Sequence, residues 1–269
     1  MTMEATVETK IAEPEKKDKS KEFLLTDEKS RLLDIFNAMG IMSNGKNALI
    51  SPVAMNVMGK SMEFGFMDKT GTIVVFGKWT PKVLQPGEVT DLVVNPEIVC
   101  QAIMSMNDAP VSLRLEENLL VVSTNQCRAR IRVELKPSGE ALKIPQFKKF
   151  EATWEGEANE IRSVMERASK MLTPKRYRLH IDGNILNLDL GSIVSDNLDY
   201  TSKVVGMVKL LGQNADDIAS DFPASVVSSL FKIPPGKMTL SLGKDYPLKM
   251  EMSDPTLNIS YILSPETQQ

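Results

Sequence analysis

The chain has 269 residues, of which 42% are hydrophobic and 25% are charged, and its formal net charge is −3. These are ordinary values for a globular protein, and the length allows one large or two ordinary domains. The slightly acidic balance argues against a uniformly basic, nucleic-acid-coating surface, although it permits one basic face. No apolar run approaches the roughly 20 residues of a membrane span. Cys100 and Cys127 are too few for a disulfide framework, so we expect reduced cysteines and an intracellular protein with no membrane segment.

Residues 1–21 mix lysines with acidic residues and contain no aromatic side chain. Such a segment buries too little apolar area to offset the entropy of ordering, so we expect a disordered N-terminal extension. It has no apolar core of a secretory signal. The alternative is a lysine-bearing arm that reaches for DNA.

Four amphipathic helices are expected in chain order. The first covers about Asp27–Met39, and the second opens at Asn95-Pro96-Glu97, a capping residue followed by Pro in the first turn. The third ends at Pro174, and the fourth covers Pro223–Lys232, begun by Asp221-Phe222-Pro223. Their expected buried residues are Leu32, Ile35, Phe36 and Met39; Ile98, Val99, Ala102, Ile103 and Met106; Ile161, Val164, Met165, Ala168, Met171 and Leu172; and Val226, Val227, Leu230 and Phe231.

Short alternating segments between these helices predict strands, with hairpin turns at 116–118 and 182–184. The expected strands are Thr72–Gly77, Val111–Leu115, Leu119–Ser123, Arg128–Leu135, Tyr177–Ile181, Ile185–Leu190, Lys203–Leu210 and Met238–Leu242.

The helices of the second half follow those of the first at an offset of roughly 130 residues, which indicates a duplicated architecture. We therefore expect an α+β fold of two similar domains, each with antiparallel sheets and two helices on one face. The expected division is a disordered extension at 1–21, a first domain at 22–136, a connector at 137–149, a second domain at 150–266 and a tail at 267–269.

Few residues suggest catalysis. His180 lies in an alternating strand, where a satisfied sheet residue is expected rather than a base. The acidic residues Asp189, Asp196, Asp199 and Asp216-Asp217 lie in turn-like sequence, and no Cys/His cluster has metal-ligand spacing. We therefore expect that the protein is not an enzyme and binds no cofactor and no metal. The alternative is a nuclease with a two-metal site.

The last third carries the most specific pattern: a short helix, the strand Met238-Thr-Leu-Ser-Leu, the segment Asp245-Tyr-Pro-Leu-Lys-Met-Glu, and the closing segment Tyr261-Ile-Leu-Ser-Pro265. The apolar island Leu142-Lys-Ile-Pro145 precedes it in an otherwise charged connector. In order and spacing, these segments resemble the DNA sliding clamps of the proliferating cell nuclear antigen type, as a divergent archaeal or viral member.

This resemblance implies the DNA clamp fold and three identical chains that close head-to-tail into a ring around duplex DNA. It also implies that the protein makes a DNA polymerase processive and contacts DNA without reading its sequence. The implied partners are the DNA polymerase, other clamp-binding peptides and a clamp loader. Ring closure would pair the edge Cys127–Leu135 of one chain with a strand near Tyr200–Val208 of the next.

Positions that match the family's DNA-facing basic residues lie on the helices, while the second helix offers none in Glu97, Gln101, Met104 and Ser105. The implied DNA-facing residues are Arg31, Arg162, Arg167, Lys170 and Lys232. The implied partner groove is formed by Val57 in a loop after Pro52, Leu142 and Ile144 in the connector, Pro247, Ile262 and Ser264.

Three alternatives stay open. One is a viral processivity factor with the clamp fold that acts as a monomer or dimer. The others are a catalytic α+β protein such as a nuclease, and a protein-interaction module.

Overall fold

The structure is a computed structural model, and it describes residues 23–40, 53–67, 72–85, 90–137, 147, 149–170, 174–192, 199–211, 218–224, 227 and 236–265. Several expectations fall outside these residues: the extension at 1–21, Leu142 and Ile144, Met171 and Leu172, Asp196, Asp216 and Asp217, Lys232 with most of the expected fourth helix, and the tail at 267–269.

The described strands form three sheets in which all pairs are antiparallel. The first has the order β5-β1-β7-β8-β9 and the third β14-β13-β12-β16; between them lies a ten-stranded sheet, β10-β6-β2-β3-β4-β19-β18-β17-β11-β15. The strands are β1 Leu24–Asp27, β2 Val53–Met58, β3 Ser61–Met67, β4 Ile73–Trp79, β5 Val83–Gln85, β6 Thr90–Val94, β7 Val111–Glu116, β8 Leu119–Ser123, β9 Arg128–Arg132, β10 Glu134–Pro137, β11 Ala152–Glu157, β12 Pro174–Asp182, β13 Ile185–Ser192, β14 Asp199–Val204, β15 Met207–Leu210, β16 Ile218–Pro223, β17 Lys237–Leu242, β18 Leu248–Ser253 and β19 Leu257–Leu263.

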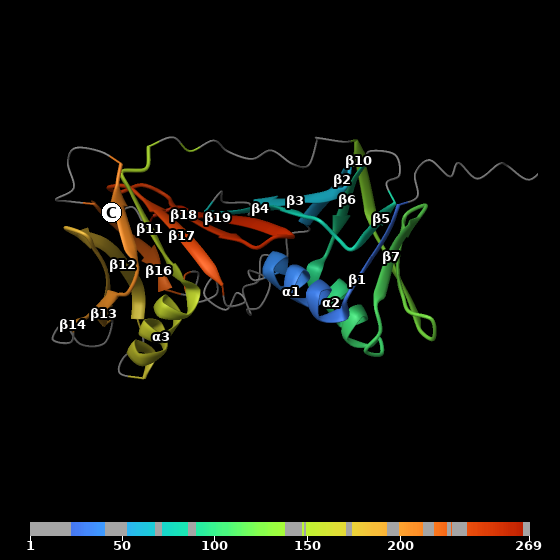
Figure 1. The fold of residues 1–269 in the computed structure, drawn as a ribbon, viewed down its shortest axis with the longest axis horizontal. Coiled ribbons are helices and arrows are strands. Elements are labelled where there is room, and N and C mark those ends of the chain that lie inside the picture. The colour runs from blue at the N-terminus through green and yellow to red at the C-terminus, as the bar shows by residue number, and fades with distance from the viewer. Residues whose placement is uncertain are drawn as a thin grey trace, which may run out of the picture.

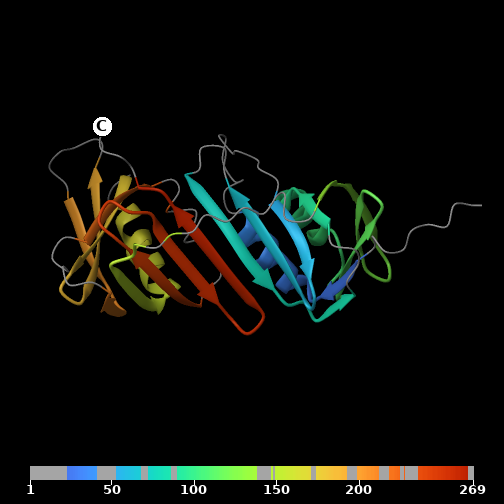
Figure 2. The same cartoon turned by 90° about the horizontal axis from the view of Figure 1, so that it is seen from above.

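The ten-stranded sheet joins the N-terminal half (23–137) to the C-terminal half (147–265). The junction is the pair β4–β19, in register from Leu257 opposite Trp79 to Leu263 opposite Ile73. Figure 2 shows these strands running side by side across the middle of the elongated molecule. Because a strand pair is held by a ladder of backbone hydrogen bonds, this junction fixes the two halves together along one face.

The helices α1 (Lys29–Gly40), α2 (Pro96–Met104) and α3 (Ala158–Ser169) all lie on the same side of the ten-stranded sheet (Figure 1). Each one buries an apolar stripe beneath it, for example Leu32, Ile35 and Phe36 at 0% exposure in α1. Burying one such side chain contributes about 1.5–3 kcal/mol. The opposite faces of the three helices are therefore exposed on a common side of the molecule.

The expected helices and hairpins are largely confirmed. Asn95 caps α2, with its Oδ1 accepting from the amides of Glu97 and Ile98 at 3.0 and 3.4 Å. Both predicted turns close tight hairpins, and Glu117 and Gly183 adopt positive φ of 56° and 57° in them.

Three helix details were wrong. Asp27 belongs to β1, so α1 begins two residues later than expected. Ile98, expected in the core, is 45% exposed on α2. Asp221-Phe222-Pro223 end strand β16 rather than opening a helix, although Ala224 and Val227, the described positions beyond them, are helical and buried.

Two segments expected as single strands are each divided between two sheets. Arg128–Leu135 separates at Val133 into β9 and β10, and Lys203–Leu210 separates at Val205-Gly206 into the end of β14 and β15. At both corners, where the chain passes from one sheet to the next, inward-facing and outward-facing residues keep alternating because the two sheets enclose one core. At the first corner, Ile131, Val133 and Leu135 all point into that core. At the second corner a Cβ on Gly206 would lie 2.1 Å from Nε1 of buried Trp154, so only glycine fits.

Candidate functional site

The polar face of α1 carries two basic residues, and both are engaged by other parts of the chain. Lys29 Nζ donates to the carbonyl of Met106 at 2.8 Å and lies 3.2 Å from Asp108 Oδ1. It therefore neutralises the segment just after α2, where carbonyl groups leave a negative potential. Lys29 contributes little free positive charge to this face.

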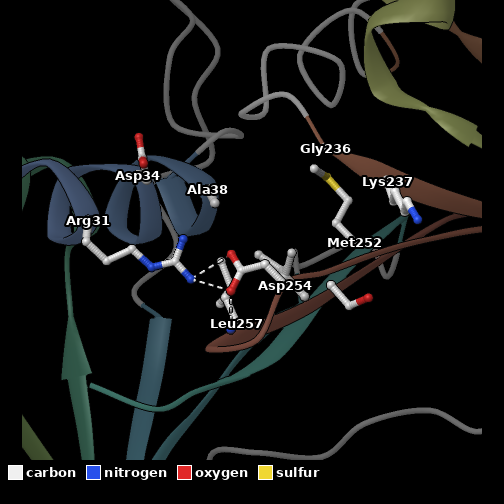
Figure 3. A pocket seen from close by; sticks show the side chains of 10 residues that line it. Arg31, Asp34, Ala38, Gly236, Lys237, Met252, Asp254 and Leu257 are labelled. Carbon is white, nitrogen blue, oxygen red and sulfur yellow. Dashed lines mark hydrogen bonds and ion pairs between the residues drawn. The ribbon is translucent and has the colours of Figure 1, made fainter. Parts of the chain in front are cut away.

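Arg31 reaches across to the turn between β18 and β19. Its Nη2 donates to both carboxylate oxygens of Asp254, at 2.8 and 2.7 Å, and to Thr256 Oγ1 at 2.5 Å. The expected DNA-facing guanidinium is thus held by a carboxylate of the other half of the molecule (Figure 3).

Asp254 also organises its own turn. Its Oδ1 accepts from the amides of Thr256 and Leu257 at 2.8 and 2.9 Å and from the Thr256 hydroxyl at 3.0 Å. Burial acts to raise the pKa of Asp254, but the hydrogen bonds from Thr256 and Arg31 and the Arg31 charge outweigh it and hold the pKa below its ordinary value. The carboxylate is therefore ionised throughout the neutral range.

A third basic residue of the N-terminal half is paired as well. Lys82 Nζ lies 2.6 Å from Glu28 Oε1, just before α1. This hydrogen bond to Glu28 raises the pKa of Lys82 above its ordinary value. An exposed pair of this kind adds little stability, but it cancels charge locally.

The outer face of α2 carries no basic residue. Ile98 and Met104 are 45% and 57% exposed on it, and Glu97 adds a negative charge in the first turn. The helices of the N-terminal half therefore present a neutral to acidic surface with two exposed apolar side chains.

α3 differs. Arg162, Arg167 and Lys170 lie on or just after it, and Arg167 and Lys170 are exposed. Arg167 Nε donates only to the Ser163 carbonyl one turn earlier, at 3.3 Å. Within the part of the chain that the structure describes, Arg167 and Lys170 have no ion-pair partner. These two charges are available to an external anion.

A small cavity separates α1 from the β17–β19 region. It measures about 70 Å³, and Figure 3 shows Asp34, Lys237 and Met252 around it, with the Arg31–Asp254 pair at one side. Burial raises the pKa of Asp34, although the positive charge of Arg31 opposes this shift. The cavity holds room for very few water molecules and is no substrate pocket.

The expected partner groove is only partly assembled among the described residues. Val57 was expected in a loop, but it lies in β2, is 6% exposed and packs into the core on the helix side of the ten-stranded sheet. Ile262 is 3% exposed and points to the opposite face, since its neighbours Tyr261 and Leu263 enter the core. Val57 therefore cannot line one surface with Ile262.

Pro247 and Ser264 are each partly exposed near the ends of β18 and β19. The Ser264 amide donates to the Thr72 carbonyl at 2.8 Å, which places the end of the C-terminal half beside the start of β4. Leu142 and Ile144 of the same expected groove lie outside the described residues.

Among the described residues, Asp189 and Asp221 each lie beside side chains of the neighbouring strand β12. His180 Nδ1 lies 2.9 Å from Asp189 Oδ2, and Asp221 Oδ2 lies 3.8 Å from both Arg176 and Arg178. Among the described residues there is no group of three His, Cys, Asp or Glu side chains arranged to hold a metal. In the same part of the chain, no helix is long and apolar enough to cross a bilayer.

Sequence reasoning missed Asp254 and Thr256. Asp254-Pro255-Thr256 has the composition of a turn in which an Asp side chain accepts from the amide two residues later, and the structure has that bond. The partner Arg31 is 223 residues away, and no local pattern indicates such a pair.

No family model and no curated protein sequence matches this chain. Solved structures do match it. The A. fulgidus proliferating cell nuclear antigen, solved with the C-terminal region of FEN-1 bound, has a TM-score of 0.74 at 15% identity, over 92% of this chain and 99% of that chain. The antigen of Entamoeba histolytica gives 0.72 at 14% identity, over 91% and 99%. That of Thermococcus kodakaraensis gives 0.74 at 9%, over 91% and 100%.

Proposed function

We propose that this chain, which has the fold of the sliding clamps, is itself a DNA sliding clamp. The observation that carries the proposal is the match of its fold, over nine-tenths of the chain, to three proliferating cell nuclear antigens. In this role the protein encircles duplex DNA inside the cell and tethers a polymerase, which raises the polymerase's local concentration at its substrate. It is a scaffold rather than an enzyme.

The proposed assembly is a ring of three identical chains. The edge strand β9 ends the five-stranded sheet, and the edge strand β14 ends the four-stranded sheet at the other end of the molecule (Figure 1). Pairing β9 of one chain with β14 of the next would satisfy both edges and join these sheets. Because two different surfaces meet, the contact is head-to-tail and can close into a ring. The proposed domains are 22–136 and 150–266, with the connector 137–149 between them.

In the proposed ring, the helices line the central hole and DNA contact is concentrated in the C-terminal half. Arg167 and Lys170, with Arg162 on the same helix and Lys232 beyond the described residues, would meet phosphates without reading bases. Arg31 is excluded from this set because it is occupied by Asp254.

The proposed partner groove lies on the face away from the helices, near the ends of β18 and β19. It would be formed by Leu142, Ile144, Pro247, Ile262 and Ser264, without Val57. That one structural neighbour was solved with the C-terminal region of FEN-1 bound supports peptide docking as a role for this fold. A polymerase and a clamp loader are the expected partners, and Leu142→Ala with Ile144→Ala should abolish polymerase stimulation without changing the oligomeric state.

The ring is tested by light scattering at micromolar concentration together with retention on DNA. The proposal expects a trimer that remains on nicked circular DNA after loading and slides off the same DNA once it is linearised. A monomer or dimer that binds both DNA forms equally would instead favour the second candidate, a clamp-fold processivity factor that clings to one side of DNA. The observation that keeps this candidate open is that Arg167 and Lys170, at the end of α3, are exposed and have no ion-pair partner among the described residues.

A further inference from the structure

The two halves of the molecule meet on both faces. On one face the backbone ladder between β4 and β19 joins them, and the Thr80 amide extends it by donating to the Thr256 carbonyl at 2.8 Å. On the helix-bearing face, the contacts are between α1 and the β18–β19 hairpin. We propose that Arg31 and Asp254 form a latch on this second face, which fixes the angle between the two halves.

The acceptor of the latch, Asp254, is held in place by its own turn and does not depend on Arg31 for its position. Asp254 is held by the two turn amides of Thr256 and Leu257, and its own amide donates to the Leu257 carbonyl at 2.8 Å. An ion pair gains most where its geometry is already fixed, because little side-chain entropy remains to be lost. The side chains of Arg31 and Asp254 are 25% and 41% exposed, so water screens the pair in part and the fixed geometry of the acceptor is the main advantage of this contact.

A second anchor lies two helical turns further along α1. The Tyr261 hydroxyl, on β19, donates to the Ala38 carbonyl at 3.0 Å in a buried position. Seven residues separate Arg31 from Ala38, which corresponds to about 10 Å along the helix axis. Two anchors at this separation fix the direction of α1 against the hairpin, while one alone would leave it free to pivot.

The cavity shows why the anchors matter. Between the two anchors lies a cavity of about 70 Å³, lined on one side by Asp34 and Ala38 and on the other by Met252 and Ile259. Across this cavity the side chains of the two halves lack the close contact that elsewhere holds packed elements in place. On this face, polar anchors rather than dense packing resist opening, and the β4–β19 ladder becomes the natural hinge line.

The angle between the halves determines where the edge strands β9 and β14 point. In a closed ring a small change in that angle would displace the edges and open the ring, a consequence that rests on the proposed function. The latch itself belongs to the single chain and can be measured there.

The test is the distance between the halves within one chain, measured by pulsed electron paramagnetic resonance. Spin labels are attached at Met104→Cys on α2 and Ser163→Cys on α3, both exposed, with Cys127→Ser to remove the exposed native thiol. Labelled chains are diluted into excess unlabelled protein, so that only distances within a chain are seen.

Two variants break the latch in different ways. Arg31→Ala removes the donor, whereas Asp254→Asn removes the charge but keeps an oxygen that can accept from the turn amides. The matched control is Lys82→Ala, which removes an equally short ion pair that lies wholly within the N-terminal half. Far-ultraviolet circular dichroism verifies that each variant is folded.

We expect both latch variants to broaden and shift the distance distribution and the control to leave it unchanged. Unchanged distributions in both latch variants would overturn the proposal, as would loss of the folded state in either, since the pair would then be a general stability determinant. A chain that fails to form trimers but shows the broadened distances supports the latch and contradicts the ring.

Discussion

The helices of the two halves bury similar apolar stripes but differ in what they leave exposed. In the N-terminal half, Lys29 and Arg31 on α1 and Lys82 beside it are each paired with a carboxylate of the chain. In the C-terminal half, Arg167 and Lys170 have no such partner among the described residues. Similar helix placement thus supports two different surfaces. A basic residue on a helix indicates an anion site only when its charge is not already used.

The first prediction tests the buried side of the N-terminal helix pair. Burial, with a smaller effect from the Glu97 charge, raises the pKa of the Cys100 thiol to about 11, and its Sγ lies 3.4 Å from Asn37 Oδ1 of α1. At pH 8 only about one thiol in a thousand would be ionised, and the thiolate is the reactive form. Exposed Cys127 should be alkylated at least a hundredfold faster than Cys100, read by mass spectrometry. Comparable rates would show that α1 and α2 do not pack as described.

The second prediction converts the neutral surface into a basic one. Gln101→Lys with Met104→Lys places two exposed lysines on one face of α2, at i, i+3 spacing. If this face lines the same hole as α3, affinity for duplex DNA at low salt should rise by roughly tenfold, since each new phosphate contact releases counterions. Gln101→Leu with Met104→Leu is the uncharged control, and fluorescence anisotropy is the measurement. Equal affinities for both variants would place α2 away from DNA.

The third prediction concerns how much the hydrogen bond between Tyr261 and Ala38, which links α1 to the C-terminal half, contributes to stability. Tyr261→Phe leaves the buried Ala38 carbonyl without the donor at 3.0 Å, which should cost about 1–2 kcal/mol of unfolding free energy. Tyr200→Phe, on the edge strand β14 and partly buried, is the matched control and should cost less. Urea unfolding of both variants gives the comparison. Equal losses would indicate that the hydroxyl contributes nothing specific.

The fourth prediction uses two carboxylates beside Arg31 whose pKa values shift in opposite directions. The pKa of Asp254 is lowered, so its ionised form stabilises the fold above the unfolded value of 3.8, and this contribution is lost as the pH falls through the lower folded value. The pKa of Asp34 is raised by burial, so its ionisation costs stability as the pH rises through 3.8 and above.

At pH 7 we therefore expect Asp254→Asn to destabilise the protein slightly and Asp34→Asn to stabilise it slightly. Thermal unfolding at pH 7 and at pH 3 measures both effects, and the two variants should approach the parent protein at the lower pH. Shifts of the same sign at pH 7 would contradict the described electrostatics of this junction.

The sequence predicts the elements better than their connections. The stripe Leu32, Ile35 and Phe36 and the cap Asn95 are local patterns, and they predicted α1 and the start of α2 well. The corners at Val133 and at Val205-Gly206 were missed, because alternation continues unbroken when a chain passes between two sheets around one core.

The site was harder to predict for a different reason. Arg31 was identified from its position on a helix, but its partner Asp254 follows only from the pairing of β4 with β19. Val57 illustrates the opposite error: the family resemblance implied a loop, while Val53, Met55 and Val57 alternate into the core as a strand does. Which charges remain available is a tertiary property, and single-sequence patterns do not contain it.

The central claim is that α3, and not the helices of the N-terminal half, presents available charge to DNA. The most direct measurement is the slope of log affinity against log salt concentration for a short duplex. It is compared between the parent protein, Arg167→Ala with Lys170→Ala, and Lys29→Ala with Lys82→Ala, which removes the same number of charges. We predict that the α3 variant loses about 0.9 of slope for each phosphate contact removed, while the Lys29 and Lys82 variant keeps the parent slope. Equal flattening in both variants, or none in the α3 variant, would contradict the claim.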